Sequence, residues 1–269
     1  MDTSQGKSLL AALVLALSTG AIPDRPAATQ PEAARLRIVV NTAARRLYVY
    51  ENGERTRTYK VAVGMRGHRT PTGRYSISRV VWNPWWRPPA RKWAAGHKDT
   101  PPGPNNPMGR VKMYFRNLYY IHGTPYEGSL GRAVSHGCVR MANEDAIALA
   151  RLVHEYGGGA SSSTIDRLVR NSRMTRTIWL KRRIPVEIVS WSASVEDGRL
   201  ELYGWQGSFE REEIWRHALG ALREAGFDMA ELDRERLRDL VEISRRAPVS
   251  APLEELVAAE PAEGLVRGS

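Results

Sequence analysis

The chain has 269 residues, of which 42% are hydrophobic and 26% charged, and its formal net charge is +11 at pH 7. This composition excludes a chain that is disordered throughout, and the single cysteine excludes any disulfide within the chain. The charge is uneven, with 31 basic against 15 acidic residues in 1–209 and 9 against 14 in 210–269. A basic body with an acidic appendage is therefore expected.

The first residues have the layout of a secretory signal peptide, predicted at 1–21. A lysine precedes an apolar run at 9–17, and small residues follow that run. The run is shorter than the roughly 20 residues that a membrane span needs, so an uncleaved anchor is the weaker alternative. The Pro- and Ala-rich stretch at 22–35 is predicted to be a linker.

Short alternating segments joined by Gly and Pro turns dominate the next part of the chain. Asn52-Gly53 and Asp197-Gly198 are hairpin signals, because these residues tolerate the positive φ of tight turns. After the first hairpin, strands are predicted at 74–81, 111–115, 119–122, 177–180, 186–191 and 199–203. Many short strands of this kind predict a mainly β (α+β) domain of the sandwich type at 36–206.

A long loop at 82–107 contains seven prolines and four tryptophans. Proline removes backbone donors, so this segment is neither a central strand nor a continuous helix. A stiff loop of this length is often a lid or the rim of a binding site. It can equally be a loop that its tryptophans pack over the core, and the sequence leaves both readings open.

Two helices are predicted after the cysteine. Asn143 is placed to cap the first helix and Gly157 to end it, while Ser163 or Thr164 would cap the second. The acidic tail at 207–269 is also predicted to be helical.

Within that tail, Ile214, Ala218 and Leu222 form one apolar stripe. Asp228 with Glu231 resembles a capping box ahead of a further helix.

The lone thiol, Cys138, is either a small buried hydrophobe or a reactive group. An enzyme that forms a thioester needs a thiolate, a base and donors for the oxyanion. His122 ends an apolar strand 16 residues earlier, and the Gly123 carbonyl is placed to orient its ring. Gly137 allows close backbone approach to a substrate, and Arg140 adds positive potential that lowers the pKa of the thiol and attracts a carboxylate.

Other residues near this motif have alternative readings. His136 is either a second base or purely structural, and His68 lies on a loop that warrants a test. Tyr114 and Tyr120 are strand tyrosines that could reach the site. A zinc site made by the two motif histidines and the thiol is disfavoured, because the paired short spacings typical of zinc ligands are absent from the sequence.

The motif "IHG…SHGCVRM" resembles the L,D-transpeptidase (YkuD-like) catalytic domain family, whose signature is a histidine followed by [ST]-x-G-C-[hydrophobic]-[RN]. The strand "RTPTGRYSI" and the closing strands "PVEIVSWSASVEDGRLELYG" are also similar to that family, so the resemblance covers about 36–204. "WNPWWRPP" and "PPGPNNPMG" resemble its envelope-anchored Gram-negative members. The chain departs from the family where "YGWQ" replaces the closing D-x-Y, and nothing after about residue 209 is recognised.

The resemblance implies a peptidoglycan cross-linking enzyme of the periplasm that uses no cofactor and is a carbapenem target. Cys138 would attack the amide of the third, L-centred stem residue and release D-Ala, with His122 as base and the Gly123 carbonyl orienting it. The residues that would shape the substrate pocket and oxyanion site are Ser135, His136, Gly137, Arg140 and Tyr120. The expected partners are stem peptides, with a second stem or a lipoprotein lysine as acceptor. Nucleic acid is not expected, and membrane contact only through an uncleaved signal segment.

Two alternatives remain open at this point. Water could resolve the same thioester, which would make the chain an L,D-carboxypeptidase or an endopeptidase. A non-catalytic wall-binding module with an inert Cys138 is the reading from another class, although a pure binder has no need for the thiol.

Overall fold

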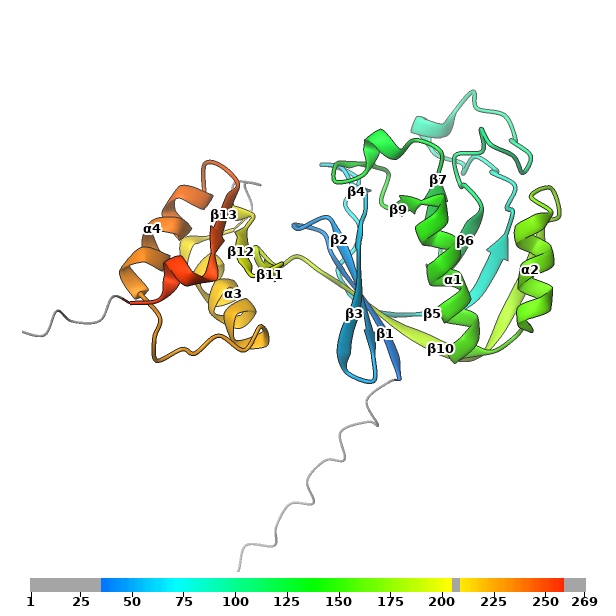
Figure 1. Cartoon of the computed structure of the whole chain (residues 1–269). Helices are drawn as coiled ribbons and strands as arrows, with labels where there is room; N and C mark the ends of the chain where they lie inside the picture. Colours follow the sequence, from blue (N-terminus) through cyan, green and yellow to red (C-terminus); the bar gives the residue numbers. More distant parts are fainter. Residues whose placement is uncertain (1–34, 205–208, 259–269) are drawn as a thin grey trace, which may run out of the picture. The chain divides into compact units, whose positions relative to one another are not determined.

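The computed structural model describes residues 35–204 and 209–258 (Figure 1). Their buried apolar side chains form two large cores and a small cluster on β1 and β2. The larger domain contains a mixed eight-stranded sheet in the order β3-β2-β1-β10-β5-β6-β7-β9 and a parallel pair, β4-β8. The strands are β1 (Leu36–Asn41), β2 (Arg46–Glu51), β3 (Glu54–Lys60), β4 (Val63–Gly64), β5 (Gly73–Trp82), β6 (Val111–Arg116), β7 (Tyr119–Thr124), β8 (Ala133–Ser135), β9 (Val139–Ala142) and β10 (Arg176–Val189). The prediction of a mainly β domain is confirmed.

The two faces of this sheet differ in character because alternate strand residues point in opposite directions. On one face, residues in register across five strands are buried: Ile178, Val80, Met113, Ile121 and Val139. Helix α1 (Asn143–Gly157) packs on this face with its predicted apolar stripe, and α2 (Ser162–Arg170) lies beside α1 (Figure 1). The opposite face of the same strands carries polar residues, and the candidate site lies there.

The sheet is nearly closed on itself. Ala62 follows edge strand β3 and forms two backbone hydrogen bonds with Arg140 on the other edge strand, β9, at 2.9 and 2.8 Å. Strand β9 is therefore hydrogen-bonded on both sides, which fixes the backbone immediately after Cys138.

Both predicted hairpin turns are present, with positive φ at Asn52-Gly53 and Asp197-Gly198. The prediction of separate strands at 177–180 and 186–191 was wrong in one respect, because both segments belong to the single strand β10. An irregular register between Trp179 and Ile184 lets one strand continue through a polar, basic stretch. Trp82, expected in the long loop, is instead the fully buried last residue of β5, where its indole donates to His154 at 3.1 Å.

The predicted N-terminal caps of the larger domain were wrong, although both helices exist and α1 ends at Gly157 as predicted. Asn143 is the first residue of α1 rather than its cap, and its amide bonds to neighbouring loops. Helix α2 is capped by Ser161, which accepts from the backbone amide of Thr164 at 3.3 Å. Several consecutive residues there have capping side chains, so the residue that caps depends on where the preceding loop enters the helix.

The C-terminal module has its own core, built from an antiparallel sheet and two helices. Its elements are β11 (Ala193–Glu196), β12 (Arg199–Leu202), α3 (Arg211–Glu224), α4 (Arg234–Ser244) and β13 (Val249–Pro252). The predicted stripe of α3 is fully buried in this core. Strand β12 pairs with β11 on one side and with β13 on the other, so these strands form a sheet of their own and do not extend the larger sheet. The strands that follow β10 therefore pack in the core of the C-terminal module and not in that of the larger domain. The domain boundary at 206 stays a prediction.

The capping box predicted for α4 was also wrong. Asp233 caps the helix by accepting from the amides of Glu235 and Arg236 at 3.0 and 2.9 Å. Asp228 instead closes a turn five residues earlier by accepting from Ala230.

The signal peptide and linker predicted at 1–21 and 22–35 lie outside the described residues, apart from Arg35. Among the described helices, none combines the length and the apolar character needed to cross a bilayer.

Candidate active site

A cleft of about 1060 Å³ opens on the polar face of the larger sheet and contains Cys138. Six of the eight predicted site residues line it: Cys138, His122, Ser135, His136, Arg140 and Tyr120. The remaining two are glycines that act through the backbone, as described below. His68 and Tyr114, which sequence analysis left open, also line the cleft.

Strand register brings the histidine and the thiol to one place. Strands β7 and β9 are parallel neighbours, with Ile121 opposite Val139 and His122 opposite Arg140. Because successive residues alternate between faces, His122 shares a face with Arg140 and with Cys138, which immediately precedes β9. The two segments are 16 residues apart in sequence and adjacent in the sheet.

The imidazole of His122 is buried and held in one tautomer. Its Nδ1 lies 2.7 Å from the Gly123 carbonyl oxygen, which can only accept, so Nδ1 carries the proton and Nε2 keeps a lone pair. Burial lowers the pKa of His122 to about 3, and the charges of Arg140 and Lys112 add to this shift while the Gly123 carbonyl opposes it. The ring is therefore a neutral base at physiological pH.

The Cys138 thiol is partly exposed in the cleft and protonated at rest. Burial raises the pKa of Cys138 to about 11, although the backbone of Tyr120 and the charges of Arg140 and Lys112 act in the opposite direction. The thiol donates a weak hydrogen bond to the Leu118 carbonyl, with the sulfur 3.7 Å from the oxygen. The thiol and the imidazole therefore line the same cleft, and both are uncharged at rest.

The turn that precedes the thiol is fixed by Ser135. Its hydroxyl donates to the Cys138 carbonyl at 2.6 Å and accepts from the Gly137 amide at 3.1 Å. Gly137 has φ +108°, and a Cβ at this position would collide with the ring of Tyr119. Ser135 and Gly137 therefore position Cys138, and the turn requires glycine at residue 137 on steric grounds.

His136 forms part of a cleft wall. Its ring stacks on Trp93 of the long loop, with centroids 3.9 Å apart and planes 10° apart, and its edge meets His68 at 4.8 Å. Burial, His68 and Arg140 lower the pKa of His136. These contacts make His136 an aromatic surface that connects the thiol motif to the loop.

One amide links the histidine to the loop and to α1. Asn143 accepts from the Arg110 amide at 2.9 Å and donates to the Thr124 carbonyl at 3.3 Å. A Cβ added at Gly109 or at Gly123 would overlap the side-chain oxygen of Asn143. This close packing sets the position of Gly123, whose carbonyl orients His122.

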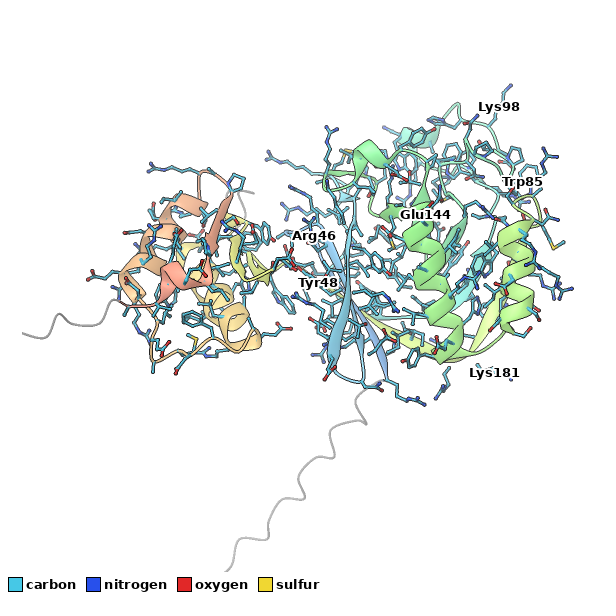
Figure 2. The ribbon with its side chains drawn as sticks, in the orientation of Figure 1. Arg46, Tyr48, Trp85, Lys98, Glu144 and Lys181 are labelled. Atoms are coloured by element: carbon cyan, nitrogen blue, oxygen red, sulfur yellow. The ribbon has the colours of Figure 1, made fainter. Side chains whose placement is uncertain are left out.

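The long loop has an internal framework centred on Asn106, which is fully buried. The Asn106 amide donates at 2.9–3.0 Å to three carbonyls of the loop, those of Pro84, Thr100 and Pro101. Figure 2 shows Trp85 and Lys98 of this loop at one end of the larger domain. The tryptophan packing that the sequence suggested is thus accompanied by a hydrogen-bonded core, and a lid motion stays a prediction.

The cleft is strongly cationic. The described residues that line it include no aspartate or glutamate, and its basic residues are Arg69, Arg87, Arg91, Lys92, Lys112 and Arg140. Sequence analysis missed Lys112 and Trp93. The alternation of Lys112 with buried Val111 and Met113 was a usable signal for a residue on the polar face, whereas the contact of Trp93 with His136 had no local signal.

Comparison with known proteins supports the class of enzyme that the fold and the cleft indicate, which is a cysteine-dependent acyltransferase. Residues 35–188 match the family model described as the L,D-transpeptidase catalytic domain, YkuD. The chain belongs to this family.

Curated relatives include YbiS of Escherichia coli (strain K12), named "Probable L,D-transpeptidase YbiS", which is 39% identical over 43% of this chain and 40% of its own length. "Probable L,D-transpeptidase ErfK/SrfK" of Salmonella typhimurium is 36% identical over 53% of this chain and 48% of its own length. The chain thus matches about two fifths to half of the length of these relatives.

Solved structures of L,D-transpeptidases also match part of the chain. An L,D-transpeptidase from Mycobacterium smegmatis is 16% identical with a TM-score of 0.39, over 58% of this chain and 59% of the other. The catalytic domain of the E. faecium L,D-transpeptidase is 14% identical with a TM-score of 0.38, over 58% of this chain and 97% of the other. The family assignment rests on the sequence match, and these overlaps carry no further argument.

Proposed function

We propose that the chain is a periplasmic peptidoglycan L,D-transpeptidase with Cys138 as nucleophile and His122 as base. The observation that carries this proposal is a cationic cleft that holds both the Cys138 thiol and the unprotonated His122 imidazole. Such a cleft attracts a stem peptide through its carboxylates, and the imidazole can accept a proton as the sulfur attacks.

In the first half-reaction, Nε2 of His122 takes the thiol proton as the sulfur attacks the carbonyl carbon of the third stem residue. We assign the backbone amide of Cys138 to the developing oxyanion, in the turn that Ser135 holds. The carbon–nitrogen bond to D-Ala breaks, the imidazolium returns its proton to the leaving amine, and a thioester remains.

In the second half-reaction, an acceptor amine attacks the thioester carbon. His122 accepts a proton from that amine, and the departing sulfur recovers a proton, which restores the resting pair. The acceptor in this proposal is the side-chain amine of a second stem, giving a 3-3 cross-link. A lipoprotein lysine could enter the same step.

Covalent labelling tests the nucleophile. Incubation with imipenem is expected to add the drug mass to the intact protein at Cys138, and the adduct should be absent in Cys138→Ala. His68→Ala, which alters the cleft without touching the proposed pair, should still form the adduct. A protein that retains wall fragments yet forms no adduct with drug or donor would instead be a binding module.

The acceptor is tested with a tetrapeptide stem. Transfer predicts loss of D-Ala and formation of a dimer when a second stem is supplied, read by mass spectrometry. Loss of D-Ala that gives only the tripeptide, with or without the acceptor, would assign the water-resolved carboxypeptidase reaction. Incubation with purified peptidoglycan followed by muramidase digestion distinguishes 3-3 cross-links from lipoprotein attachment.

A further inference from the structure

A row of large side chains extends from the thiol across the polar face of the sheet. Trp179 of β10 pairs with Arg79 of β5, Arg79 with Tyr114 of β6, and Tyr114 with Tyr120 of β7. In the register of β7 and β9, Tyr120 lies beside Cys138. One residue from each of four neighbouring strands therefore joins the nucleophile to Trp179, outside the cleft.

Ring contacts hold this row together. The Arg79 guanidinium carbon lies 3.9 Å from the ring centroid of Tyr114 and 4.9 Å from that of Trp179. The rings of Tyr114 and Tyr120 are 4.5 Å apart. Within the described part of the chain, no carboxylate forms an ion pair with Arg79. Its planar donors are thus stacked in place and not occupied by an acid.

Trp179 is the exposed end of the row, with 62% of its surface accessible. Ile178, which precedes it in β10, is buried on the opposite face, and the register of β10 becomes irregular directly after Trp179. The indole therefore contributes little to the core of the domain and presents a flat apolar face to solvent next to the donors of Arg79.

The row is longer than the part of the stem that links the third residue to its sugar, so its far end lies where the sugars would be. Four steps between neighbouring strands, at about 4.8 Å each, separate Cys138 from Trp179 by about 19 Å. The two stem residues and the lactyl group that link the third residue to its sugar reach about 11 Å when extended. A donor bound along the row with its third residue at Cys138 would bring its disaccharide to Arg79 and Trp179.

We propose that Trp179 and Arg79 form a glycan subsite that binds the sugar end of the donor. This inference rests on the proposed function and names a part of the substrate beyond the stem. A sugar ring presents C–H groups on its face and hydroxyls at its rim, which suit an indole face beside a guanidinium. A purely acidic peptide would be attracted by the cations throughout the cleft and would not need Trp179.

Binding to the full chain carrying Cys138→Ala tests the subsite without turnover. Two probes are compared by calorimetry, the free tetrapeptide and the disaccharide-linked tetrapeptide. Trp179→Ala is expected to raise the Kd of the disaccharide probe about 3- to 10-fold and to leave that of the free peptide unchanged. Trp179→Tyr should restore most of the affinity, and Ile243→Ala, which removes an exposed side chain of α4, should match the parent.

An equal loss for both probes would mean that the row binds the peptide, and it would overturn the glycan subsite. The absence of any loss, or of any binding of the disaccharide probe to the parent, would overturn it as well. Failure of the proposed function has a separate signature, because wild-type Cys138 would then form no thioester with either donor while the comparison of affinities still decides the subsite.

Discussion

The thiol and the imidazole at the centre of the cleft depart from their usual pKa values in opposite directions, and burial is the main cause of both shifts. A free histidine and a free cysteine would each change charge between about pH 6 and 9. In this cleft both groups keep one protonation state over that range. Burial thus keeps the thiol and the imidazole uncharged at rest. In the proposed reaction, the thiolate and imidazolium would form only as the sulfur attacks.

Acylation of Cys138 is therefore expected to vary less than about threefold between pH 5 and 8. His122, whose pKa is lowered to about 3, stays unprotonated throughout this range. The Cys138 thiol, whose pKa is raised to about 11, stays protonated throughout it. The measurement is the single-turnover rate of imipenem adduct formation by mass spectrometry. A loss of rate with a midpoint near pH 6.5 would show an ordinary, solvated histidine and contradict the buried tautomer.

Among single residues, the sequence predicted that Cys138 and His122 lie in one cleft, and it did not predict the residues that surround them. A lone cysteine after Ser-His-Gly and an earlier His-Gly pair indicate a thiol and a base, because each residue's chemistry is local. Lys112 and Trp93 enter the cleft through strand register and loop path. Those depend on contacts between distant segments, which a motif does not encode.

Among the elements, the long loop depends on one buried amide. Asn106→Ala removes the amide whose two N–H bonds are shared among the carbonyls of Pro84, Thr100 and Pro101, and it should destabilise the loop by about 1–3 kcal/mol. We expect faster hydrogen exchange within 84–107 and slower acylation, with unchanged protection in β1 and β2.

Asn105→Ala is the matched control, because this neighbouring asparagine is exposed. It should leave both exchange and acylation near the parent values. If the two variants behave alike, the framework around Asn106 does not shape the cleft.

The cap of α4 gives a second matched pair. Asp233→Ala should lower the free energy of unfolding by about 1 kcal/mol, because two backbone amides lose their acceptor. Asp228→Ala removes one bond in an exposed turn and should change it by less than about 0.5 kcal/mol. Urea denaturation followed by circular dichroism measures both changes in the free energy of unfolding. A larger loss in Asp228→Ala than in Asp233→Ala would support the capping box predicted from the sequence.

Element types were predictable here and their ends were not. Periodicity places α1 and the stripe of α3 correctly, since each pattern extends over several turns. The predicted cap of α2 failed because residues 161–164 are all serine or threonine, and that of α4 failed because Asp228 and Asp233 both precede the helix. The cap is decided among them by the direction from which the chain enters.

For the whole molecule, two cores imply two separable contributions to stability. Leu237→Ala creates a cavity in the core of the C-terminal module and should cost about 2–5 kcal/mol there, while the acylation rate at 25 °C stays near the parent value. Leu47→Ala makes the same truncation in the core of the larger domain and should lower both stability and acylation. Calorimetric scans with parallel imipenem labelling distinguish the two, and loss of acylation in Leu237→Ala would contradict separate cores.

The extent of each core was the least predictable feature. Strand β12 pairs with β13 about 50 residues later, and no local pattern announces that partner. The strands at 193–202, which were predicted to close the larger domain, pack in the module instead, and the match to the family model ends before them, at residue 188.

The close packing of Gly109, Gly123 and Asn143 also constrains how such a sequence can drift over generations. A methyl group at either glycine needs the space of the Asn143 side chain, so the tolerated substitution at one position depends on what occupies another. Viable lineages would therefore have to change these sites jointly, through rare intermediates. The orientation of His122 thus depends on all three of these residues together.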